Sequence, residues 1–200
     1  MAIILASQSP RRRELLIQMG LTEFEICPAQ GEEKIDAALT PRQLVEQLSL
    51  QKAQEIVQKR GEEHLIIAAD TVVSMDGQVL GKPQNERMAK EMLQCLSGRE
   101  HTVYTGITVC QNGLITTQSE KTKVRFYALT EQEIDQYIAT GEPMDKAGSY
   151  GIQNYGALFV AGIEGDYFNV VGLPIGRLHR ILLQYGVDVL SEQAEKRLSR

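Results

Sequence analysis

The sequence predicts one α/β domain built on a mixed sheet flanked by helices. Its 200 residues suit a single domain, and a domain of this length can be divided into two lobes. Short apolar stretches typical of strands alternate with stretches of helical periodicity along the chain. Two tight-turn signals, Asp76-Gly77 and Asn112-Gly113, predict hairpins and therefore some antiparallel strand pairs.

The chain begins with an apolar strand over residues 3–6 that runs directly into a helix over residues 10–19. Ser9 is a suitable N-cap, Pro10 suits the first helical position and Gly20 ends the helix. Three arginines, 11–13, occupy the first turn, although cations are unfavourable where the helix dipole is already positive. Either this is a solvated basic turn, or its amides and guanidinium groups bind a polyanion.

A short strand over residues 24–27 comes before the next helix, which begins with a capping box at Thr40 and Gln43 and reaches about Lys59. Lys52 falls on the apolar face of this helix. A lysine in that position either extends its ammonium to solvent or points at an anion.

The strongest strand pattern covers residues 65–73, and Asp70 interrupts its apolar run. Such continuous apolarity is typical of a central strand covered on both faces. A carboxylate buried there needs a cation or a chemical task, unless Asp70 only caps a strand end together with Thr71. A strand-borne aspartate of this kind commonly holds a magnesium ion or a water nucleophile.

The second half of the chain continues the alternation. We expect helices over residues 85–96, 131–139 and 174–185, and strands over residues 101–110 and 114–127. The glycine-rich stretch 141–156 mixes both charges with an aromatic residue, so it is either a structural loop or one that closes over a ligand. Residues 1–190 form the domain in this interpretation, and residues 191–200 form a charged tail that we expect to be frayed.

Bulk composition limits the function. The net charge of −5 argues against a nucleic-acid or anionic-membrane surface, so any anion site is a local pocket. No stretch is long enough to span a bilayer and no secretion signal is visible. The three cysteines are scattered, which favours reduced thiols in a cytoplasmic protein and argues against a zinc site or a cysteine nucleophile.

The candidate functional residues fall into two groups. Arg11, Arg12, Lys52 and Lys82 are suited to an anion, and Asp70 with Glu33 is suited to a hard cation. Each has an ordinary alternative: Glu33 in a solvated loop, and Lys82 as a surface lysine within Gly-Lys-Pro. Together they are the inventory of metal-assisted phosphoryl chemistry. No Walker or dinucleotide-binding motif is present.

These residues also form an ordered set of motifs. The set is Ser7-x-Ser9-Pro10-Arg11-Arg12, Ala69-Asp70-Thr71-Val72, Gly81-Lys82-Pro83, Ser97-Gly98-Arg99-x-His101, Glu142-Pro143-x-Asp145-Lys146-Ala147-Gly148, Gly151-Ile152-Gln153, Gly165-Asp166-Tyr167 and Val171-Gly172-Leu173-Pro174. In this order, over residues 3–185, the sequence resembles the Maf family of nucleoside triphosphate pyrophosphatases.

The resemblance implies a two-lobed fold like that of the inosine triphosphate pyrophosphatases, with a nucleotide cleft between the lobes. It implies cleavage of a nucleoside triphosphate into monophosphate and pyrophosphate with a divalent cation, Mg²⁺ or Mn²⁺, and also a homodimer. Arg11, Thr71 and Gln153 match the specificity positions of the branch that acts on dTTP and UTP, rather than the branch that acts on 7-methyl-GTP.

The resemblance and the residues together suggest specific roles. Asp70 is the expected general base and, with Glu33, the expected cation ligand. The side chains expected to neutralise the triphosphate are Arg12, Lys52 and Lys82, while Ser9 and its neighbouring amides are expected to cradle one phosphate. Gln153 has a donor and an acceptor on one amide and can pair with a uracil or thymine edge.

Two other functions remain open at this point. A nucleotidyltransferase also releases pyrophosphate, but nothing in the sequence marks an acceptor pocket. A nucleotide-binding regulator of septum formation and cell division would use the same cleft without essential turnover.

Overall fold

The computed structural model describes residues 2–31 and 38–198. Seven strands form one sheet in the order β2-β1-β3-β5-β6-β7, and β4 pairs with β3. The strands are β1 (Ile3–Leu5), β2 (Glu25–Ile26), β3 (Leu65–Met75), β4 (Gln78–Leu80), β5 (Glu100–Gln111), β6 (Leu114–Phe126) and β7 (Val160–Glu164). β1 is parallel to β2 and β3, whereas the other pairs are antiparallel. The predicted mixed sheet is therefore confirmed.

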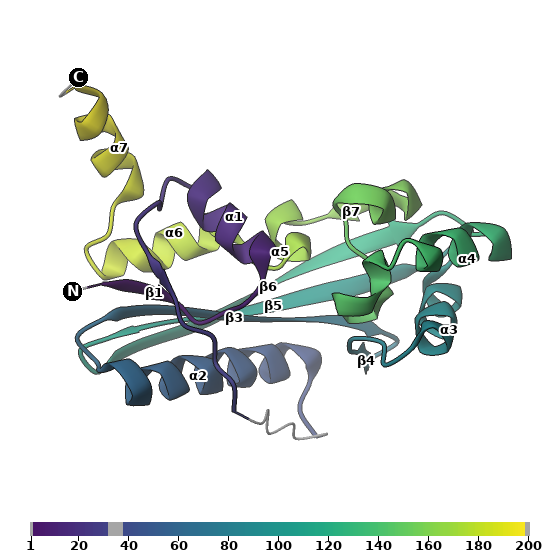
Figure 1. Ribbon diagram of the computed structural model, residues 1–200, viewed down its shortest axis with the longest axis horizontal. Helices are drawn as coiled ribbons and strands as arrows, with labels where there is room; N and C mark the ends of the chain where they lie inside the picture. The colour runs from purple at the N-terminus through teal and green to yellow at the C-terminus, as the bar shows by residue number, and fades with distance from the viewer. Residues whose placement is uncertain (1, 32–37, 199–200) are drawn as a thin grey trace.

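Helices flank this sheet on both faces (Figure 1). They are α1 (Pro10–Gln18), α2 (Pro41–Arg60), α3 (Glu86–Leu96), α4 (Glu131–Ala139), α5 (Tyr167–Val171), α6 (Ile175–Gln184) and α7 (Val189–Leu198), with the 3₁₀ turns η1 (Glu142–Asp145), η2 (Ala147–Ser149) and η3 (Asn154–Phe159). Five of these helices and five of the strands match the elements expected from the sequence. The expected N-caps Ser9, Thr40 and Thr130 are all present.

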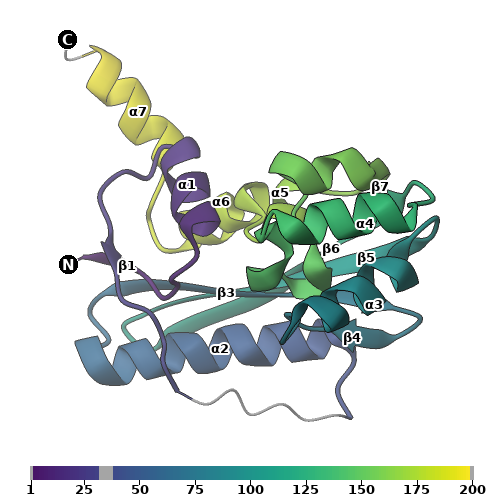
Figure 2. The ribbon, with the colours of Figure 1, turned by 45° about the vertical axis from the view of Figure 1, so that its right-hand side comes forward.

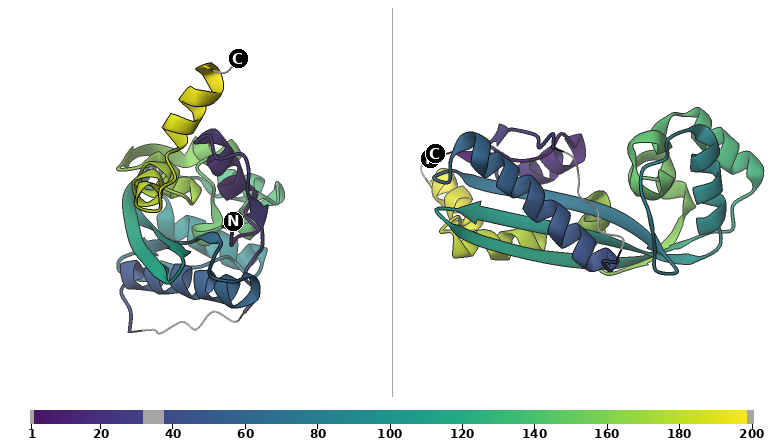
Figure 3. Two further views of the ribbon diagram at one scale, coloured as in Figure 1. Left: turned by 90° about the vertical axis from the view of Figure 1, so that its left-hand side faces the viewer. Right: turned by 90° about the horizontal axis from the view of Figure 1, so that it is seen from below.

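Side-chain alternation along β3 assigns its two faces. Ile66, Ala68 and Val72 pack with residues of α2. Ile67 and Val73, which point the opposite way, belong to two other apolar clusters: one built with α1 and α6, the other with α3 and α4. α2 therefore covers one face, and two groups of helices share the other, at opposite ends of the sheet (Figures 1 and 3). These two groups are the two lobes of the fold.

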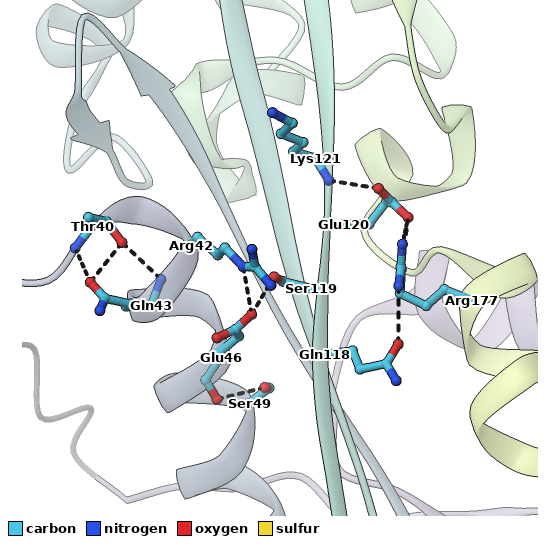
Figure 4. A network of polar contacts seen from close by, with 10 residues as sticks. All are labelled: Thr40, Arg42, Gln43, Glu46, Ser49, Gln118, Ser119, Glu120, Lys121 and Arg177. Atoms are coloured by element: carbon cyan, nitrogen blue, oxygen red, sulfur yellow. Dashed lines mark hydrogen bonds and ion pairs between the residues drawn. The ribbon is translucent and has the colours of Figure 1, made fainter. Parts of the chain in front are cut away.

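Strand β6 is linked to helices on both faces (Figure 4). Ser119 Oγ donates to Glu46 of α2 over 2.5 Å, and Arg42 Nε donates to the same carboxylate over 3.0 Å. Gln118 and Glu120 point to the other face, where each accepts a hydrogen bond from Arg177 of α6. Strand alternation thus divides three consecutive residues between two helix layers.

Three features were not expected from the sequence. β7 and α5 are short elements within the motif-rich segment 160–171. α7 is a helix that extends away from the rest of the molecule (Figure 2), in a segment to which the sequence assigned no element. The boundary between a domain of residues 1–190 and a tail of residues 191–200 stays a prediction. Within the described ranges, no helix is long and apolar enough to cross a membrane.

The edge of β3 is open at one point. Its pairing with β1 ends at Ile67, and its pairing with β4 begins at Val73. Between these residues β3 pairs only with β5 among the described strands. Asp70 and Thr71 lie in this opening, and the loop after β1 leads from it into α1. The sheet topology therefore exposes polar groups at an otherwise apolar strand.

Gly106 of β5 lies directly across from Asp70 and allows α2 to approach the sheet closely. A Cβ at this position would lie 2.2 Å from the carbonyl oxygen of Val45 in α2. Since backbone atoms cannot move aside, we expect Gly106→Ala to lower the free energy of unfolding by about 2–3 kcal/mol, measured by urea denaturation.

Gly176→Ala is the matched control, because an added Cβ there meets nothing within 4 Å. In helix α6 this change is expected to raise stability by about 0.5–1 kcal/mol. Equal effects of the two alanines would contradict the close approach of α2.

Candidate functional site

A cavity of about 500 Å³ lies at the open edge of β3. Volumes of this size are typical of small-molecule sites. Eight of the nine residues singled out from the sequence line it: Ser9, Arg11, Arg12, Lys52, Asp70, Thr71, Lys82 and Gln153. The ninth, Glu33, lies outside the described residues. The structure thus brings together groups that the sequence places up to 144 positions apart, from Ser9 to Gln153.

Asp70 and Lys52 form an ion pair at the α2 face of the opening. The Lys52 ammonium contacts Asp70 Oδ1, and Asp70 is only 9 % exposed. This pair decides two alternatives that the sequence left open. The carboxylate in the strand has a cation as its partner, and the lysine on the helix points at an anion and not at solvent. Asp70 lies within β3, so it is not a strand-end cap.

The second carboxylate oxygen, Asp70 Oδ2, makes no hydrogen bond or ion pair with the described part of the chain. A carboxylate oxygen of this kind suits a hard divalent cation, which commonly takes one or two carboxylates plus substrate phosphates. Three or more metal-binding side chains do not gather at any point among residues 2–31 and 38–198. Any cation held at Asp70 therefore takes its further ligands from water, from the substrate or from residues outside these ranges.

Arg12 is held in place at the start of α1 by three acceptors from separate segments. Its Nε donates to Gly172 O over 2.8 Å, Nη1 donates to Ser7 Oγ over 3.2 Å, and Nη2 donates to Thr71 Oγ1 over 3.0 Å. Ser9 caps the same helix by accepting from Arg12 N. A guanidinium fixed in this way is ordered before any ligand arrives.

Arg11 reaches across the cavity from α1 to η1 in the opposite lobe. It donates to Asp145 of η1 over 3.2 Å, and Lys146 also contacts that carboxylate, over 2.6 Å. Burial alone would raise the pKa of Asp145, but Lys146 and Arg11 outweigh it and hold this pKa below its ordinary value. Asp145 and Lys146 were not among the candidate site residues. The sequence signals for them were the charged, glycine-rich segment 141–156 and the motif over residues 142–148 within it.

Lys82 and Gln153 reach the cavity from loops. Lys82 is exposed on the connection between β4 and α3, and it makes no hydrogen bond or ion pair with the described residues. The loop that carries Gln153 is braced by Glu142, whose carboxylate accepts hydrogen bonds from Tyr155 N and Gly156 N, each over 3.1 Å. The Gln153 amide is not needed for this bracing and has no hydrogen-bond partner within the described ranges.

Behind the cavity wall lies a buried histidine. His101 Nε2 and the hydroxyl of Tyr150 are 2.7 Å apart, and Tyr150 lines the cavity. Burial lowers the pKa of His101 to about 4 and raises that of Tyr150, so both groups are neutral at pH 7. His101 thus supports the cavity wall as a neutral partner and is not a proton donor to a ligand.

The fold and the cavity define a class: an α/β protein whose cavity places cationic side chains beside a paired carboxylate. The Maf-like protein family model matches residues 2–185. The dTTP/UTP pyrophosphatase of Bacillus cereus strain ZK / E33L is 52 % identical over 187 residues, covering 94 % of this chain and 97 % of the relative. That of strain B4264 is 51 % identical with the same coverage. The chain therefore belongs to the Maf family.

Solved structures also resemble parts of the chain. The Ham1 protein of Staphylococcus aureus matches with a TM-score of 0.46 and 11 % identity, covering 62 % of this chain and 71 % of that protein. A HAM1 protein from Coxiella burnetii matches with a TM-score of 0.45 and 16 % identity, covering 62 % and 72 %.

The low pKa of His101 makes stability depend on pH. In the unfolded chain the imidazole takes up a proton near pH 6.5, but in the folded protein only near pH 4. The unfolded state therefore binds more protons between these values, and stability falls as pH decreases. Between pH 7 and 5 we expect the wild type to lose about 2 kcal/mol more than His101→Phe, measured by urea denaturation at each pH. Equal losses in the two proteins would contradict the buried neutral imidazole.

Proposed function

We propose that this protein hydrolyses dTTP and UTP between the α- and β-phosphates, giving the nucleoside monophosphate and pyrophosphate. The observation that carries the proposal is the Lys52–Asp70 ion pair within the cavity that Arg12 and Lys82 also line. The relatives named dTTP/UTP pyrophosphatase, which align over 94 % of this chain, support it.

In this proposal Asp70 is the general base. It takes a proton from the water that attacks the α-phosphorus, while the bond from that phosphorus to the bridging oxygen breaks and the electron pair leaves with pyrophosphate. Lys52 holds the carboxylate in position before the reaction. Arg12 and Lys82 neutralise the charge that moves onto the leaving pyrophosphate, and the capped N-terminus of α1 at Ser9 cradles one phosphate.

A divalent cation, Mg²⁺ or Mn²⁺, completes the proposed site. When bound, it would supply charge neutralisation at the phosphate oxygens. Asp70 Oδ2 is the described atom suited to hold it, and Glu33 remains the predicted second ligand. We further propose that the protein acts in the cytoplasm, consistent with its three free cysteines. A homodimer, and the absence of nucleic-acid or membrane partners, stay predictions.

The reaction is tested by its products. The protein is incubated with dTTP and Mg²⁺, with no other nucleotide acceptor, and the products are resolved by chromatography. The proposal expects dTMP and pyrophosphate. Orthophosphate with dTDP would contradict the cleavage position, and no consumption of dTTP would favour a nucleotidyltransferase or a regulator instead.

Lysine substitutions test the anion-binding groups. Lys52→Ala and Lys82→Ala are each expected to lower kcat/KM for dTTP by about 100-fold or more, because each removes positive charge beside the reacting phosphates. Lys59→Ala is the control, since Lys59 is 45 % exposed and pairs with Glu55 on the surface of α2. Equal, small effects of all three substitutions would mean that the anion pocket is misplaced.

Base selectivity tests Gln153. A uracil or thymine edge offers carbonyl acceptors beside an N–H donor, which one amide can match, whereas cytosine cannot match it. A mispaired buried polar group costs about 1–3 kcal/mol, so we expect dTTP to be preferred to CTP by about 10–100-fold. Gln153→Ala should reduce this ratio of kcat/KM values. An unchanged ratio in a folded variant would place base recognition elsewhere.

A further inference from the structure

A series of hydrogen bonds runs from Arg12 at the cavity into the core, where its inner end is buried. Arg12 Nη2 donates to Thr71 Oγ1 over 3.0 Å. Thr71 Oγ1 lies 2.9 Å from Thr105 Oγ1 of β5, and Thr105 Oγ1 donates to the backbone carbonyl of Asn169 in α5 over 2.9 Å. Thr105 and Asn169 are both 0 % exposed, so water cannot replace any of these inner partners.

The groups at the two ends of this hydrogen-bond series, Arg12 and the Asn169 carbonyl, fix the direction of each hydrogen bond. A guanidinium only donates and a backbone carbonyl only accepts. Thr105 therefore gives its single hydroxyl proton to Asn169 O, and it can only accept from Thr71. Thr71 in turn gives its proton to Thr105 and accepts from Arg12. The Thr71 hydroxyl consequently has no proton left to donate to a ligand.

Helix α5, at the inner end of this hydrogen-bond series, is itself fixed to the sheet by hydrogen bonds. The side-chain amide of Asn169 donates to Val103 O and to Thr122 Oγ1, each over 3.0 Å. Thr122 Oγ1 in turn donates a hydrogen bond to Asp166 O over 2.8 Å. The residue that follows α5, Gly172, accepts from Arg12 Nε directly. α5 thus supports the Arg12 guanidinium both directly and through the two threonines.

We propose that Thr105 is a positioning residue for Arg12: it orients the Thr71 hydroxyl, which then holds Nη2 of the guanidinium toward the polyanion. The inference rests on the proposed phosphate-binding role of Arg12. It also limits Thr71, which offers a substrate a lone pair but not a proton. A substrate group that meets Thr71 must therefore be a hydrogen-bond donor.

Thr105→Val tests the proposal, because it removes the hydroxyl while nearly keeping the shape of the side chain. We expect kcat/KM for dTTP to fall by about 10-fold or more through misplacement of Arg12. Thr105→Ser, which restores the hydroxyl, should return kcat/KM to within about 3-fold of the wild type.

Thr108→Val is the matched control. Thr108 lies on the same strand and is also 0 % exposed, and its hydroxyl bonds Ser49 and Thr117 on the α2 face, away from Arg12. Both valine variants should lower the Tm similarly, but only Thr105→Val should impair catalysis. Equal catalytic losses in the two variants, or none in Thr105→Val, would overturn the proposal.

A double-mutant cycle separates positioning from general loosening of the fold. In an Arg12→Ala background, adding Thr105→Val should change kcat/KM by less than about 2-fold, because its effect passes through Arg12. A full, additive loss in that background would overturn the proposal.

Binding of inorganic pyrophosphate, measured by calorimetry, keeps the test independent of turnover. If the wild type failed to hydrolyse dTTP, the proposed function would fail. The positioning role would still be supported if Thr105→Val bound pyrophosphate more weakly than Thr108→Val, and overturned if the two bound it equally.

Discussion

The ion pair between Lys52 and Asp70 is the interaction on which the site depends. Neither side chain suits its element alone: one is a cation on the apolar face of α2, and the other is a carboxylate inside the central strand. A charge left unpaired in such a place costs several kcal/mol. Together they join α2 to β3 at the point where the sheet edge opens, and they place a negative oxygen among cations.

The opening of β3 gives two consecutive residues different tasks. Asp70 faces α2 and its lysine, whereas Thr71 faces α1 and holds Arg12. Because neighbouring residues of a strand point to opposite faces, the two side chains approach the cavity from the two sides of the sheet. One short segment of strand thereby organises both the carboxylate and the guanidinium.

Much of this arrangement was predictable from the sequence, because it is encoded locally. Proline and serine mark the start of α1, the capping box marks α2, and the break in apolar periodicity marks Asp70. Lys82 was grouped with the other cations because of its Gly-Lys-Pro setting. The convergence of Gln153 on the same cavity followed only from the family resemblance, since no local signal specifies contacts between distant loops.

The features that the sequence did not predict share one physical cause. The role of Asp145 depends on the bridge from Arg11, which spans 134 positions of sequence, and Thr105 appears as an ordinary β-branched strand residue. α5 has five residues, too few for helical periodicity to be visible. Such partners are defined by packing and by the direction of hydrogen bonds, which only the folded chain provides.

The proposed reaction depends on Asp70 acting as the base within a preformed anion site. Its most direct test is Asp70→Asn, which keeps the shape and removes the base. Single-turnover hydrolysis of dTTP and the affinity for a non-hydrolysable α,β-imido dUTP are measured in parallel. We expect a loss of hydrolysis of about 10³-fold with affinity nearly retained. Hydrolysis at the wild-type rate, with unchanged affinity, would contradict it.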